Sequence, residues 1–128
     1  MDRYEDVNSR HMPVIGLLTL ELHLVDSHSL KDKRHYVLGL KERLRKKFNL
    51  AVSETEDMDL LNRAVIAAVT VSASRPHAER VLRAAEEQAA AFLGPYLVEA
   101  WVEWVELTEN IIVAWLIRGI IVAWLHQS

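Results

Sequence analysis

The fold of this chain is indicated first by residues 13–24, which read PVIGLLTLELHL. The apolar side chains on one side of this stretch are Val14, Leu18, Leu20, Leu22 and Leu24. The residues on the other side are Thr19, Glu21 and His23. A period of two with one apolar face is typical of a strand that is buried on one side only. We therefore expect a half-buried strand here.

Two helices and three further strands are predicted after this strand. Ser29 and Asp32 match a capping box, so a helix is expected to begin at about residue 30 and to end at about residue 48. Ser74, followed by a proline in the first turn, begins a second helix that ends before residues 94–95, a Gly-Pro pair. The three strands are predicted at residues 49–56, 63–73 and 96–107.

This order of elements predicts an α+β domain with the ferredoxin-like βαββαβ arrangement. In that arrangement an antiparallel sheet carries two helices on one face. Numbered along the chain, the strands are expected in the order 4-1-3-2, which places the two most apolar strands in the middle. The other face of the sheet is then free of helices. The domain is predicted to span residues 13–107.

The two ends of the chain depart from this plan. Residues 1–12 are polar and of mixed charge, and they are predicted to be a flexible extension, with Met12 as an alternative start. Residues 108–128 are an apolar C-terminal tail in which IIVAWL occurs twice, at 111–116 and 120–125. A membrane span needs about 20 apolar residues. The tail falls short of this and contains Arg118, so a β-hairpin is the predicted structure.

Composition limits the chemistry that this chain can perform. The 128 residues are enough for one domain with a sizeable core, and 51% of them are hydrophobic. The chain has no cysteine, which excludes disulfides, thiolate nucleophiles and Cys-ligated metal sites. The first residues lack the apolar core of a secretory signal. These features predict a cytoplasmic globular domain.

Charge is segregated along the chain. Residues 30–48 contain eight Lys or Arg and two Asp or Glu, a net charge of +6, so the rest of this chain of net charge −3 carries −9. A basic helix on an acidic domain is a plausible contact surface for a phosphate backbone. The predicted contacts with nucleic acid or another anion are Ser29, Lys31, Lys33, Arg34, Lys41, Arg45 and Lys46.

A solvated helix face is the alternative interpretation of these charges. The lysines could instead pair with acidic residues that follow the helix, namely Glu54, Glu56, Asp57 and Asp59. Lys33 and Lys41 lie near the edge of the apolar stripe and could extend over it. The interpretations left open are a solvated face, a nucleic-acid partner (RNA above all) and another anionic partner.

Several segments resemble one known family. They are GLLTLELHL at 16–24, SHSLKDKR at 27–34, KFNLAVSE at 47–54 and DLLNRAVIAAVTVSAS at 59–74. Together they resemble the YlxP-like family, a small bacterial domain of unknown function, over roughly residues 12–107. The resemblance implies a ferredoxin-like fold. It also implies a context in translation or ribosome maturation, because the family's genes lie beside those for a translation initiation factor and a ribosome-binding factor. Leu61 stands where the family often has tryptophan.

The helix-free sheet face is the other predicted surface. Glu21 and His23 from the first strand, and Trp101 between Glu99 and Glu103 of the last strand, should lie on it. Because carboxylates repel phosphate, an interface role for Glu21, His23 and Trp101 is favoured over base stacking.

No arrangement of residues in the sequence indicates catalysis. His23, His28 and His35 could approach one another, but no helical pair of metal-ligating histidines occurs, so we expect no metal and no cofactor. The prediction is a non-enzymatic RNA- or ribosome-associated accessory factor. The alternative is a homo-oligomeric interaction module that uses the helix-free face and the apolar tail. A small-anion or metal enzyme is a third, weaker class.

Overall fold

The computed structural model describes residues 12–106 and 109–127. The chain divides into two units, of which residues 13–105 form the larger. The elements are β1 (Val14–His23), α2 (Leu30–Phe48), β2 (Ala51–Glu56), β3 (Arg63–Ser72), α3 (Arg75–Leu93), the 3-10 turn η1 (Gly94–Tyr96), β4 (Leu97–Val105) and α4 (Glu109–Gln127).

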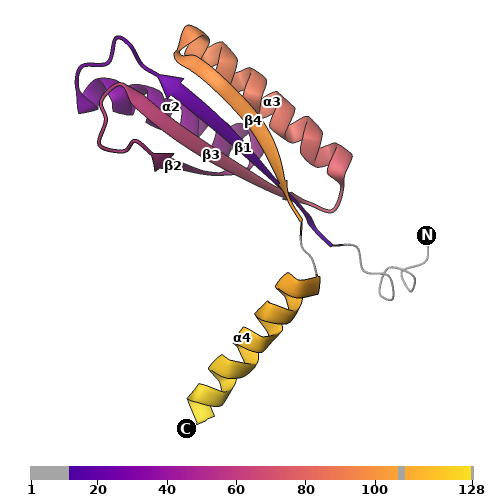
Figure 1. The fold of residues 1–128 in the computed structure, drawn as a ribbon. Helices are drawn as coiled ribbons and strands as arrows, with labels where there is room; N and C mark the ends of the chain where they lie inside the picture. The colour runs from indigo at the N-terminus through magenta and orange to yellow at the C-terminus, as the bar shows by residue number, and fades with distance from the viewer. Residues whose placement is uncertain (1–11, 107–108, 128) are drawn as a thin grey trace. The chain divides into compact units, whose positions relative to one another are not determined.

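The larger unit is a four-stranded sheet in the order β2-β3-β1-β4, in which every neighbouring pair is antiparallel (Figure 1). The central strands β1 and β3 pair along their whole length, from Val14 opposite Ser72 to His23 opposite Arg63. Helices α2 and α3 lie together on one face of this sheet (Figure 1). The predicted ferredoxin-like α+β fold, with its strand order and single helical layer, is confirmed.

The core lies between the sheet and the two helices. Alternate residues of β1 and β3 point into it, and each helix contributes one apolar stripe, so burial follows the period of each element. The largest fully buried side chains are Leu18, Leu20, Leu22, Leu24, Leu40, Leu44, Ile66 and Leu82.

Local signals set the ends of both helices. The Ser29 hydroxyl accepts a hydrogen bond from the Asp32 backbone N–H at 3.1 Å, and the Ser74 hydroxyl accepts one from the His77 N–H at 3.3 Å. Asn49 ends α2 in the left-handed conformation, with φ of 53°. The predicted caps at both helix starts are therefore present.

Gly16 on β1 allows the side chains of Leu82 from α3 and Trp104 from β4 to lie close to the β1 backbone. A Cβ atom at this position would lie 2.6 Å from Leu82 Cδ1 and 2.8 Å from Trp104 Cζ3. We expect Gly16→Ala to lower the free energy of unfolding by about 1–3 kcal/mol, because both neighbours must shift. Urea unfolding would measure this loss. The control is Gly119→Ala, where an added Cβ meets nothing within 4 Å, and a stabilised Gly16→Ala variant would contradict the packing argument.

The tail differs from the prediction. Residues 109–127 form the helix α4 rather than a hairpin around residues 117–119. An isolated two-stranded hairpin leaves backbone groups unpaired and is marginal in water, whereas a helix satisfies most of them within the segment. The side chains from Leu116 to His126 are all exposed, although most are apolar. Of the helices in the described ranges, none has the length and apolar character needed to span a membrane. The predicted extension at 1–12 lies outside the described residues, except for Met12.

Candidate nucleic-acid interface

The serine-rich start of SHSLKDKR is partly internal. Ser27 is buried, and its hydroxyl donates a hydrogen bond to the Leu61 carbonyl at 2.6 Å. Its backbone N–H donates to the Leu24 carbonyl at 2.9 Å. The side chain of Ser29, predicted to contact an anion, is instead used as the α2 cap. Ser27 therefore joins the start of α2 to the turn that connects β2 with β3.

Lys33 is also internal, with only 3% of its surface exposed. Its ammonium donates to the carbonyls of Asp57 at 2.7 Å, Leu60 at 2.6 Å and Met58 at 3.4 Å. Because an ammonium has three hydrogens, these carbonyls use all of them. Glu54 Oε2 lies 2.9 Å from the same nitrogen and accepts no hydrogen bond, so this buried oxygen is held by charge.

We call Ser27, Lys33 and Glu54 the turn clamp, because together they hold residues 57–61. Lys33 is therefore not available at the surface, and we remove it from the predicted phosphate contacts. Glu54 is one of the acidic residues with which the solvated-face interpretation expected the lysines to pair. A sequence signal for its burial exists: Lys33 stands four residues before Val37, at the start of the buried stripe of α2.

Asp32 completes the first turn of α2. Its carboxylate accepts a hydrogen bond from the His28 backbone N–H at 3.1 Å. That bond, followed by the contact with Ser29, lowers the pKa of Asp32 below its ordinary value of 3.8. A carboxyl whose pKa is lowered by folding stabilises the folded protein above its unfolded pKa, and this contribution is lost as the pH falls through the folded pKa.

We therefore expect Asp32→Ala to be less stable than the wild type at neutral pH and to converge with it under acid conditions. Urea unfolding at pH 7 and in steps down to pH 3 would measure the difference in free energy of unfolding. The control is Glu87→Ala, an exposed carboxylate within α3. A pH-independent difference for Asp32→Ala would contradict the assigned role.

Four of the predicted cations share one side of α2. Lys31, Arg34, Lys41 and Arg45, with Leu38 between them, recur at intervals of three and four residues. That spacing places them on one side of a helix over about 21 Å. Arg45 Nη2 donates to the Val52 carbonyl at 2.9 Å, so this side adjoins the edge strand β2. We call these four residues the basic flank.

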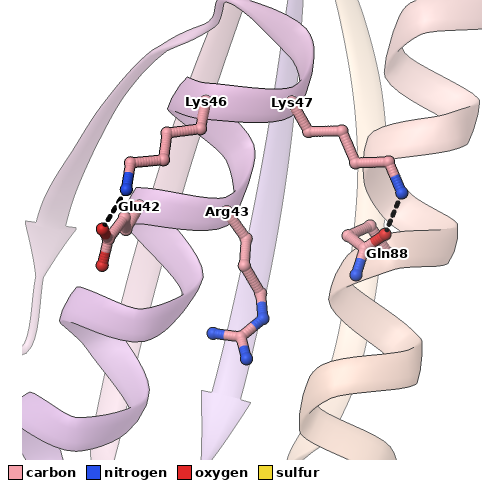
Figure 2. A pocket seen from close by; sticks show the side chains of 5 residues that line it. All are labelled: Glu42, Arg43, Lys46, Lys47 and Gln88. Carbon is pink, nitrogen blue, oxygen red and sulfur yellow. Dashed lines mark hydrogen bonds and ion pairs between the residues drawn. The ribbon is translucent and has the colours of Figure 1, made fainter.

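The other side of α2 faces α3 across a shallow hollow of about 360 Å³ (Figure 2). Lys47 reaches across it and donates to Gln88 Oε1 at 2.9 Å, and Arg43 lies between the helices. The Arg43 guanidinium stacks 3.8 Å above the Phe92 ring. The ammonium of Lys46 donates to Glu42 at 2.7 Å and lowers the pKa of that carboxyl. Lys46 thus lies on a different side of α2 from the basic flank and is paired with a carboxylate at the surface.

Aromatic contacts fix α2 against the end of α3. Tyr36 meets Tyr96 edge to face with ring centroids 5.1 Å apart, and it lies 6.5 Å from Phe92. The Tyr96 hydroxyl donates to Asp26, and this bond, with Tyr36 beside it, raises the pKa of Tyr96. The turn clamp holds the opposite side of α2. Because α2 is packed on both sides, the backbone that carries its cations is held in place.

The helix-free face, which we call the open sheet face, is more apolar than predicted. Strand pairing places Thr19 opposite Trp101 and Glu21 opposite Glu99, as expected from their alternation. Trp101 Nε1 donates to Glu103 Oε1 at 2.9 Å. One end of the face, however, is formed by Ile15, Leu17, Val69, Val71 and Val105. Sequence reasoning missed this because β3 is apolar on both sides and shows no alternation.

Histidines and acids do not gather into a metal site in the described parts of the chain. Within residues 12–106 and 109–127, no group of three His, Asp or Glu side chains is placed to hold an ion. The two surfaces that the sequence indicated are the basic flank of α2 and the open sheet face.

Solved structures share the fold at low sequence identity. The de novo designed protein Foldit4 is 9% identical, with a TM-score of 0.51, and the match covers 76% of this chain and 100% of that chain. A dimeric protein of unknown function with a ferredoxin-like fold from Bacteroides fragilis is 12% identical (TM-score 0.48; 73% and 96% covered). A putative antibiotic biosynthesis monooxygenase from Caulobacter crescentus is 12% identical (TM-score 0.46; 83% and 99% covered).

Sequence comparison places the chain in a family. No curated protein sequence matches it. The family described as "Protein of unknown function (DUF503)" matches residues 15–100, which include α2, α3, nearly all of strands β1 to β3 and the start of β4. This agrees with the resemblance to a domain of unknown function, while the YlxP-like name itself stays a resemblance. Because the match covers well over half of the chain, the protein belongs to the DUF503 family.

Proposed function

We propose that this protein is a non-enzymatic RNA- or ribosome-associated accessory factor that docks on RNA phosphates through the basic flank. The observation that carries the proposal is the alignment of Lys31, Arg34, Lys41 and Arg45 along one side of α2. The resemblance to a family with translation genes as neighbours supports RNA as the anion. Such a role is carried out in the cytoplasm.

The geometry supports an extended anion better than a small one. The basic flank is about 21 Å long, with cations one or two helical turns apart, which is longer than a single small anion can span. A phosphate backbone offers a row of charges over such a length. Side chains on a clamped helix lose little further backbone freedom when they bind, which favours docking.

Electrostatic docking predicts a strong dependence on salt. Four phosphate contacts with single-stranded RNA give a slope of about −3 for the logarithm of the association constant against the logarithm of salt concentration. Affinity is then expected to fall by about 60-fold for a fourfold rise in salt. Fluorescence anisotropy with labelled structured and single-stranded RNA, and cosedimentation with ribosomal subunits, would measure this dependence.

The decisive variant is Lys31→Glu with Arg34→Glu, which leaves Lys33 in place. Its matched control is Arg80→Glu with Arg83→Glu, two exposed arginines of α3 that give the same change in net charge. The flank variant should lose most of its affinity and reduce the salt slope by about 1.5, while the control keeps both. Equal losses in the two variants, or no binding by the wild type at low salt, would refute the proposal.

A further inference from the structure

The open sheet face is an apolar surface that the helices of the larger unit leave uncovered. Both helices lie on the opposite face (Figure 1). Val71, at the apolar end, is 67% exposed, and Val105 and Trp101 are also exposed. A cluster of exposed apolar side chains on one face of a sheet is typical of an interaction surface.

We infer that the open sheet face is covered by the same face of a second copy of this chain. The arrangement of β1 and β3 carries the inference. The two strands have ten residues each, pair without a break, and are apolar at the same end of the sheet, where Ile15 lies opposite Val71 and Leu17 opposite Val69.

This arrangement makes the face complementary to itself. A two-fold axis that runs between β1 and β3, parallel to them, places β1 of one copy over β3 of the other. Ile15 and Leu17 then meet Val71 and Val69 of the second copy. Two sheets stacked in this aligned way pack about 10 Å apart.

The other end of the face is charged, and only the central strands bring opposite charges together there. There Glu21 lies on β1, while Arg63 ends β3 opposite His23. The two-fold axis brings Glu21 over Val65 of the second copy, next to its Arg63. Each of the two Glu21 side chains thus approaches one Arg63. At the sheet edges the same axis brings Glu99 of β4 over Glu56 of β2 in the second copy, so the attraction that drives pairing comes from the apolar end of the face.

The area fits a modest, reversible interface. The strands β1, β2, β3 and β4 have 10, 6, 10 and 9 residues and lie about 4.8 Å apart, so they cover about 550 Å² per copy. The total of about 1,100 Å² lies just below the range of stable complexes and in the range of transient ones. We therefore expect a reversible dimer that forms at micromolar concentration. Because the basic flank is on the helical layer, it stays accessible in such a dimer.

Sedimentation velocity of the full chain, from low to high micromolar concentration, tests this inference. Val71→Glu should raise the dimer dissociation constant by at least about tenfold, because it buries a charge in the interface. The matched control is Ile120→Glu on α4, at a position with the same exposure of 67%. The control should dimerise like the wild type.

Three results would overturn the inference. They are a wild type that stays monomeric throughout, a Val71→Glu variant that dimerises normally, and dissociation by Ile120→Glu alone, which would assign association to α4. Circular dichroism checks that both variants are folded. Because the chain has no cysteine, single-cysteine variants give a second test: a short bismaleimide should link Val71→Cys into covalent dimers but not Leu38→Cys, which lies on the helical layer.

Discussion

Replacing Lys33 by methionine is expected to lower the free energy of unfolding by about 3 kcal/mol or more. The variant leaves the partly buried Glu54 carboxylate without its counter-ion and the carbonyls of Asp57, Met58 and Leu60 without their donor. Removing one partner of a buried, hydrogen-bonded ion pair costs far more than removing an exposed charge. Urea unfolding followed by circular dichroism would measure the loss.

Lys31→Met is the matched control, because it makes the same change two residues away on the exposed basic flank. Its free energy of unfolding should stay within about 0.5 kcal/mol of the wild type. A Lys33→Met variant as stable as this control would show that the turn clamp contributes nothing. The comparison also bears on binding studies, since reversing the charge of Lys33 would unfold the start of α2 and imitate a loss of binding.

Leu40→Ala should destabilise the protein by about 3 kcal/mol. Leu40 is fully buried in the stripe by which α2 packs on the sheet, and truncation leaves a cavity between the helix and the core. Because the basic flank belongs to the same helix, RNA docking should weaken at temperatures where this variant begins to unfold, and not below them. Thermal unfolding and binding measured on the same samples would connect the two effects.

Leu38→Ala serves as its control on the same helix. Leu38 is 55% exposed between the cations of the basic flank, so its truncation removes little buried area. Its effect on the free energy of unfolding should be below about 0.5 kcal/mol. A large loss of stability in Leu38→Ala, or none in Leu40→Ala, would contradict the orientation of α2.

Local sequence patterns were enough to predict the larger unit. Alternation in β1, the capping serines of both helices and the apolar stripe of α2 are signals within one element, and each element adopted the structure that its own period favours. The tail was predicted wrongly because an apolar run without a clear period does not distinguish a strand from a helix. The repeat in it indicated a hairpin, while backbone hydrogen bonding favours the helix α4.

For the candidate site, these local sequence patterns predicted only a part of what the structure shows. The sequence by itself determined that the positive charge gathers on α2, and that β1 and β4 present Glu21 and Trp101 on the helix-free face. Only the tertiary structure decided which cations are free, because burial depends on what packs against a helix from elsewhere in the chain. The carbonyls that accept hydrogen bonds from Lys33 belong to a turn 24–27 residues further along the chain. The apolar end of the open sheet face likewise depends on the register between β1 and β3, a property of the strand pair that neither strand encodes alone.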